Sequence, residues 1–467
     1  GCLRMLLATL VASHLDCKPI VGISSGRKMI SLRQFMLVVV TLVCREFFDV
    51  VPSAAFGTSL LQILGLCLGF GLLLKMRALS ILTYCNVGAR CHDRFLAARR
   101  VVEYVWVVSL PLTLGLTEWV AWMGLLEESG CPASLSILCC FLPSLLFIAF
   151  VELTAAQTDD ILEQRLAMDR SDASLGWTAL FWMRLRLGDM TAVLTCIAPV
   201  LATAAVIDLL PGICEWLRIE TFHTALLAML GVVLLCLGLA MFPACLSRWM
   251  GALPASPANL NQQIAAFAQR LGLGKPSLRI IGSHGRWNGA AVVGWLPATR
   301  QLWLSDKLLR ELDMRELEMV ILHELAHLKR YHFLIRLLPV VVVGCMVAGI
   351  YSMNLDSTAI ALSVPIKVLI AALFLTSLLA GISWAAHYCE LDADRQACHY
   401  ALSSCDWVSP LVRPPEILGR ALAKLLLDAP EARKATWLHP SLARRIANLR
   451  LRIREESVTA KLVDSLS

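Results

Sequence analysis

Long apolar runs dominate the hydrophobic pattern of this chain. A membrane-spanning helix needs roughly 20 mostly apolar residues, and seven windows come close to that length. Prolines lie inside or at the edge of most windows, which membrane helices tolerate because neighbouring helices satisfy the freed carbonyl groups. The pattern therefore predicts about seven spans, several of them kinked, at Ala54–Leu74, Val105–Leu125, Ala133–Val151, Met190–Leu210, Thr224–Leu246, Leu337–Met353 and Ile366–Ala386.

A shorter apolar run, Phe35–Val43, leaves two alternatives open. Arg45 and Glu46 follow soon after it, so it fits either half of an eighth span or a helix lying at the membrane interface. Composition agrees with a membrane protein, since 58% of the 467 residues are apolar and only 16% are charged. A soluble enzyme is excluded by this balance.

The lysines and arginines alternate between connections. The segment after the first span is rich in them, from Lys75 to Arg100, whereas the next connection, around Glu127, has none. Because basic loops stay in the cytoplasm, residues 246–336 are expected on the cytoplasmic side. The protein itself is expected to be a multi-pass protein of the plasma (inner) membrane. The net charge of +7 is then explained mostly by the basic residues in the cytoplasmic loops and not by affinity for nucleic acid. No nucleic-acid-binding signature accompanies it, so we expect the lipid bilayer and no nucleic acid as a partner.

Two regions after the fifth span have the pattern of soluble protein. The first contains an amphipathic stretch at Gln262–Leu271 and short β-like runs at Leu278–Ile281, Ala290–Trp295 and Gln301–Ser305. The predicted fold class is mostly α, a multi-span helical membrane protein with a cytoplasmic zincin-like α+β domain interrupted by a transmembrane hairpin. The expected parts are a membrane region with about five spans, the first part of the domain, the hairpin, and the second part, at residues 1–246, 247–336, 337–386 and 387–467.

The stretch ILHELAHLKR contains the candidate chemistry. Asp313 and Glu316 have the spacing of a capping box and precede an apolar-periodic run, so they predict the start of a helix. On a helix, His323 and His327 share one face and can bind one ion. Glu324, beside the first histidine, is placed to take a proton from water activated by zinc.

A metal site needs a third ligand. The sequence HYCELDADRQAC, after the last predicted span, supplies Glu390 on what is expected to be another helix. The hairpin between the two helices would return this carboxylate to the same side of the membrane. Two histidines and one glutamate form a common catalytic zinc site.

With these motifs the chain resembles the integral-membrane zinc metallopeptidases that include the HtpX protease and the CAAX prenyl protease. The resemblance covers about residues 255–450, and it rests on ELEMVILHELAH, the E-x-x-A-D run at Glu390–Asp394, the H-P-x-x-x-x-R-I run from His439, and the strand at Asn288. It implies that His323, His327 and Glu390 bind Zn²⁺ and that Glu324 is the general base. It also implies that Asp394 orients a ligand histidine.

The resemblance further implies that the strand near Asn288 pairs with extended substrate. Gly289 follows Asn288 where the family usually has alanine, and His387 stands where relatives often carry arginine. For His439 two roles remain open, stabilising the oxyanion of the reaction or capping a helix. The other histidines, His284, His332 and His399, are expected at surfaces or interfaces. For Glu118 and Glu152, near the ends of spans, a polar cavity within the membrane and an interfacial position both remain open, whereas Lys367 is expected to reach the interface.

The function expected from these residues is zinc-dependent hydrolysis of peptide bonds in membrane-associated proteins or peptides. One alternative is a membrane signal transducer with a metallopeptidase domain. Another is a catalytically inactive membrane scaffold that keeps zinc for structure. A scaffold has no need of Glu324, and no outer-side segment is long enough for a sensor domain, so both alternatives fit less well.

Overall fold

The computed structural model describes residues 32–47, 52–84, 89–167, 176–217, 224–254, 258–282, 289–294, 296–355, 364–404, 413–425 and 434–451. The chain divides into two compact units. Within the described residues, the first unit runs from Arg33 to Cys196, and the second contains Leu32 and the residues from Ile197 onward.

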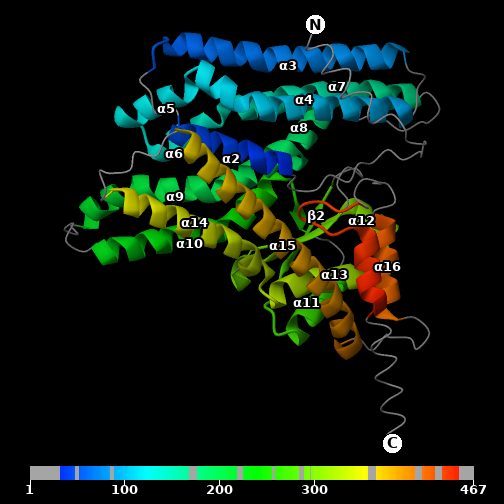
Figure 1. Ribbon diagram of the computed structural model, residues 1–467. Helices are drawn as coiled ribbons and strands as arrows, with labels where there is room; N and C mark the ends of the chain where they lie inside the picture. Colours follow the sequence, from blue (N-terminus) through cyan, green and yellow to red (C-terminus); the bar gives the residue numbers. More distant parts are fainter. Residues whose placement is uncertain are drawn as a thin grey trace, which may run out of the picture. The chain divides into compact units, whose positions relative to one another are not determined.

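The first unit is a bundle of apolar helices. Its helix α3 packs along α4 and α7 (Figure 1). Trp106 of α4 and Phe147 of α7 stack face to face with their ring centroids 4.5 Å apart, so aromatic packing joins these two helices. The elements are α2 (Leu32–Phe47), α3 (Phe56–Tyr84), α4 (Ala89–Leu116), α5 (Trp119–Glu128), α6 (Ala133–Cys140), α7 (Leu142–Ala167), α8 (Gly176–Leu187) and the first part of α9 (Asp189–Leu217).

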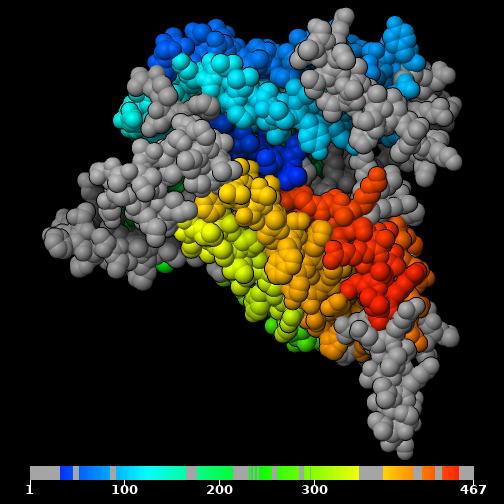
Figure 2. All heavy atoms as spheres, viewed as in Figure 1, coloured from blue at the N-terminus to red at the C-terminus, as the bar shows by residue number. Residues whose placement is uncertain are grey.

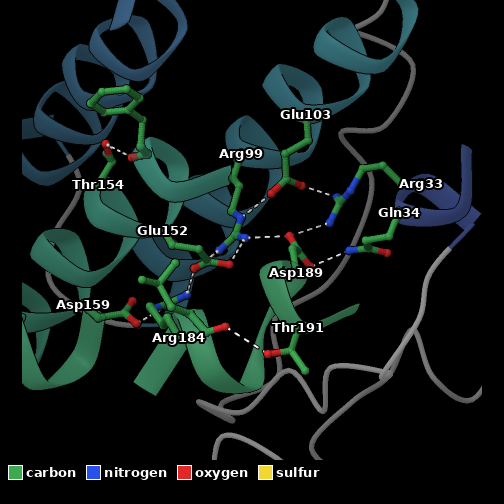
Figure 3. A network of polar contacts seen from close by, with 12 residues as sticks. Arg33, Gln34, Arg99, Glu103, Glu152, Thr154, Asp159, Arg184, Asp189 and Thr191 are labelled. Carbon is green, nitrogen blue, oxygen red and sulfur yellow. Dashed lines mark hydrogen bonds and ion pairs between the residues drawn. The ribbon is translucent and has the colours of Figure 1, made fainter. Parts of the chain in front are cut away.

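A network of charged side chains joins helices of this bundle (Figure 3). Arg99 of α4 donates to Glu152 of α7 over 2.6 Å and to Asp189 of α9 over 2.9 Å. Arg184 of α8 also donates to Glu152, over 3.2 Å. Glu152 is fully buried. Since an unpaired buried charge is costly, this pairing holds four helices together, and it accounts for Glu152 better than an interfacial position does.

Glu118, at the break between α4 and α5, has a different role. Its carboxylate accepts hydrogen bonds from the backbone amides of Ser53 and Ala54, over 2.7 and 2.8 Å. Ser53 and Ala54 lie just before the first residue of α3, so their amides have no hydrogen-bond partner inside that helix. Glu118 therefore ties the entry of α3 to the break that follows α4.

The second unit combines helices with a small sheet. The strands β1 (Leu253–Pro254), β2 (Ser277–Ile281), β3 (Ala290–Val293) and β4 (Gln301–Ser305) lie in the order β1-β2-β4-β3, with β2 and β4 parallel and the outer pairs antiparallel. The helical elements are α10 (Thr224–Trp249), α11 (Ala258–Arg270), the 3₁₀ turn η1 (Pro297–Thr299), α12 (Asp306–Glu311), α13 (Met314–Lys329), α14 (His332–Leu355), α15 (Val364–Ser404), α16 (Pro414–Leu425) and a last helix at 442–451.

The core of the second unit lies between the sheet and the helices α11, α13 and α16. Leu302 and Leu304 of β4, Leu322 of α13 and Leu418 of α16 are completely buried within it. Helix α13 contacts α15 and α16 as well as β3, so most of its surface is covered. This covering explains why the sequence around the histidines is so rich in leucine.

Among the described residues, three helices are long and apolar enough to cross a membrane, or up to five if each of two bent pairs counts as one span. The bends fall between α4 and α5 and between α6 and α7, within two of the predicted spans. The sequence predicted a separate helix for Glu390, but α15 is one continuous helix of 41 residues that contains both the last span and this glutamate. The predicted fold class is confirmed, a mostly helical chain with several apolar helices and a small sheet.

Candidate metal centre

The helix that carries the two histidines begins at the predicted capping box. The Asp313 carboxylate accepts from the Glu316 amide over 2.9 Å, and the Glu316 carboxylate accepts from the Asp313 amide over 3.1 Å. Two orphan amides are thereby satisfied at the start of α13. Lys424 of α16 also donates to Glu316 over 2.6 Å, which ties this end of the helix to the core.

Helix α15 brings Glu390 to the histidines of α13. Glu390 lies 3.7 Å from His323 Nε2 and 3.6 Å from His327 Nε2, and the two Nε2 atoms are 3.2 Å apart. All three ligand atoms lie within 4.8 Å of one another. Residues that are more than 60 positions apart in the sequence thus meet at one point, because α13 and α15 pack side by side (Figure 1).

Behind His323 lies a buried carboxylate and a buried arginine. Asp394, one helical turn after Glu390, approaches His323 Nδ1 to 3.0 Å. Arg445, on the helix at 442–451, donates to both Asp394 oxygens over 2.8 and 2.6 Å. This bidentate pair keeps the carboxylate ionised and in place to accept from His323 Nδ1, so Nε2 is the ring nitrogen that is directed toward an ion.

The surroundings act on the two histidines in opposite directions. Burial disfavours the charged form of His323, but the nearby carboxylates of Asp394 and Glu390 outweigh it and raise its pKa to about 9. For His327 burial prevails over the attraction of Glu390 and lowers the pKa well below its usual value. His327 is therefore neutral near pH 7 and ready to coordinate, whereas metal binding at His323 displaces a proton.

These donors fit zinc. Two imidazole nitrogens and one carboxylate oxygen are a common donor set for catalytic Zn²⁺, and it leaves a further coordination position open. Both Nε2 atoms face the Glu390 carboxylate. A purely structural ion pair would explain neither two imidazoles 3.2 Å apart nor a carboxylate shared between them.

Glu324 lies next to this cluster and beside the outer strand of the sheet. It is half-buried, and burial raises the pKa of its carboxyl to about 7 despite the opposing effect of His323. The backbone amide of Val292 in β3 hydrogen-bonds to the carboxylate. A carboxyl group with this pKa exchanges protons readily at neutral pH, as a general base must.

The loop at residues 434–441 contributes His439, whose Nδ1 lies 3.5 Å from a Glu390 oxygen. His439 does not cap the following helix, because the Ser441 hydroxyl accepts from the Arg444 amide there. His387 donates from Nε2 to the Thr436 carbonyl over 2.7 Å in the same loop. Of the other predicted positions, Asn288, His284 and the side chain of Lys367 lie outside the described residues.

Two further residues at the centre were not expected from the sequence. Arg336 of α14 donates to a Glu390 oxygen over 2.8 Å. His332, for which a surface or interface position was predicted, is buried and lies 2.8 Å from His327. Apart from the five-residue interval between His327 and His332, the sequence offers no local signal for either contact.

Two histidines and a glutamate that converge beside a further carboxylate are the side-chain arrangement typical of metallopeptidases of the zincin type. Residues 254–453 match the model of peptidase family M48. The sequence-based resemblance is thereby confirmed. The match to this family and the apolar helices together indicate that the protein is a multi-pass membrane metallopeptidase.

Among solved structures, the chain is similar to the crystal structure of S. mikatae Ste24p. The identity is 13%, the TM-score is 0.43, and the match covers 91% of this chain and 100% of that chain. No curated protein matches.

Proposed function

We propose that this protein is a zinc-dependent endopeptidase that hydrolyses peptide bonds of membrane-associated proteins or peptides. The observation that carries the proposal is the convergence of His323, His327 and Glu390 within 4.8 Å. The adjacent Glu324 supplies the base that peptide hydrolysis requires.

His323, His327 and Glu390 would hold the metal. Zinc, when bound, supplies a Lewis acid that polarises the scissile carbonyl and lowers the pKa of water. Glu324 takes the proton from the attacking water and then gives it to the leaving amine. Asp394 and Arg445 keep His323 in one orientation throughout, because neither side chain has freedom to move in its buried pair.

The outer edge of β3, the last strand of the sheet among the described residues, is the proposed place for the substrate backbone. Gly289 uses its carbonyl to pair with the Ser305 amide of β4. Backbone groups alternate in direction along an antiparallel strand, so Ala290 and Val292 direct theirs away from β4. The Val292 amide indeed reaches Glu324. An extended peptide paired with β3 would pass directly beside the base, and Asn288, just before the strand, is proposed to contribute to the same contact.

His439 is proposed to stabilise the negative charge that develops on the carbonyl oxygen. Its imidazole lies on the Glu390 side of the cluster and is 40% exposed, so it is accessible to substrate. The site is proposed to face the cytoplasm from the plasma (inner) membrane, as the distribution of basic residues indicates.

Replacement of Glu324 by glutamine tests the reaction. We expect Glu324→Gln to bind zinc like the wild type and to lose peptide hydrolysis by at least about 100-fold, the contribution typical of a general base. Zinc content and cleavage of a fluorogenic peptide, measured on protein in mild detergent, give the two values. Wild-type turnover in Glu324→Gln would refute the assignment of the base.

A further inference from the structure

The two histidines of the centre are supported from behind by different groups. His323 uses its Nδ1 to reach a carboxylate, Asp394. His327 instead reaches a third histidine, since its Nδ1 lies 2.8 Å from His332 Nδ1. His332 in turn approaches Asp392 through Nε2, over 3.1 Å. Asp392 accepts from Arg330 Nε, also over 3.1 Å.

The protons of this chain of contacts can be placed by elimination. His327 has Nε2 toward Glu390, so binding of an ion there requires the proton on Nδ1. His332 must then accept at its own Nδ1, and its proton must be on Nε2. That proton faces the Asp392 carboxylate, which accepts. Each donor therefore meets an acceptor only when His332 is neutral and of the Nε2–H tautomer.

The backbone places His332 at some cost. Only Arg330 and Tyr331 separate α13 from α14, and Tyr331 adopts a φ of +52°, a left-handed conformation that residues other than glycine rarely adopt. For a bulky side chain this conformation costs roughly 1–2 kcal/mol. The turn directs His332, 1% exposed, back toward the last turn of α13. A residue that only filled space in the core would not require the left-handed conformation at Tyr331.

We propose that His332, supported by Asp392, is a positioning residue that fixes the tautomer and ring orientation of His327 for metal binding. The inference rests on the proposed function. In this role, His332 and Asp392 support His327 as Asp394 and Arg445 support His323. Loss of a partner of this kind weakens metal binding by about 10–100-fold in metalloproteins.

Zinc affinity measured by competition with a chromophoric chelator tests the proposal, with detergent-purified full-length protein. His332→Leu removes the acceptor at similar volume and is expected to weaken zinc binding by about 10–100-fold. His332→Asn keeps an acceptor oxygen the same number of bonds from the backbone as Nδ1, and is expected to remain near the wild type. His399→Leu, at an exposed histidine of α15, is the matched control.

The melting temperature of the metal-free proteins separates positioning from folding. The proposal requires that His332→Leu and wild type melt alike without metal while their zinc affinities differ. Equal affinities, or equal losses in His332→Leu and His332→Asn, would overturn it. If His332→Leu does not fold, Asp392→Ala decides, because an unchanged zinc affinity in that variant also overturns the proposal. A wild type that binds no zinc would instead refute the proposed function itself.

Discussion

His387 donates a hydrogen bond from its Nε2 atom to the backbone carbonyl of Thr436 over 2.7 Å. The Thr436 amide donates to the His439 carbonyl over 2.8 Å, and the His439 amide donates to the Thr436 hydroxyl over 3.2 Å. His387 lies one helical turn before Glu390 on α15. It therefore fixes the loop of His439 to the same helix that provides the carboxylate.

Removal of this link should impair catalysis and leave the metal in place. A single hydrogen bond contributes about 0.5–1.5 kcal/mol, so His387→Leu should lower kcat/KM by roughly 2–10-fold. His387→Gln retains a donor at the position of Nε2 and should recover most of the loss. Steady-state kinetics with a fluorogenic peptide measures the effect. A loss of zinc from His387→Leu would show that the link supports the metal cluster rather than the loop.

The buried pair of Asp394 and Arg445 makes a prediction about stability. Arg445→Met would leave the Asp394 carboxylate fully buried without its two guanidinium donors. Loss of one partner of a buried ion pair costs about 3–5 kcal/mol. Thermal melting of the zinc-free protein should show this loss. Arg445→Met combined with Asp394→Asn should be less harmful than Arg445→Met alone, because the orphan charge is then absent. A double variant that melts lower than the single one would contradict this explanation.

Gly188 allows the charged network of the first unit to form. It separates α8 from α9, and a Cβ atom there would lie 2.4 Å from the Arg184 carbonyl oxygen and 3.0 Å from a Glu152 oxygen. Gly188→Ala should therefore force the backbone apart and cost roughly 1–3 kcal/mol. Gly212→Ala, on α9 with open space around it, is the control. Equal melting temperatures of the two variants would mean that the network adapts to the extra methyl group.

Local signals in the sequence predicted α13 and its two histidines well. The capping box at Asp313 and Glu316 and the four-residue spacing of His323 and His327 both act within one helix, so neither depends on the rest of the fold. The strand Gln301–Ser305 was also predicted with its observed bounds, because it is a short local run of β-forming residues, and all five of its residues are buried.

Contacts that form only when distant segments meet in the folded chain could not be predicted from local sequence signals. The position of His332 depends on a left-handed turn at Tyr331, where no glycine marks the reversal. The link from His387 to Thr436 and the pair of Asp394 with Arg445 join segments about 50 residues apart. Helix α15 was predicted in two pieces because its apolar first part and its polar second part have different compositions, although the backbone continues through both.

The proposed peptidase activity depends most directly on a single zinc ion held by His323, His327 and Glu390. Metal analysis of purified wild type and Glu390→Gln, with Glu311→Gln as a control for an exposed carboxylate on α12, tests it. We predict about one zinc per chain in wild type and control, and its loss in Glu390→Gln. A metal-free wild type that still cleaves peptides, or a Glu390→Gln variant that keeps zinc with unchanged affinity, would contradict the account.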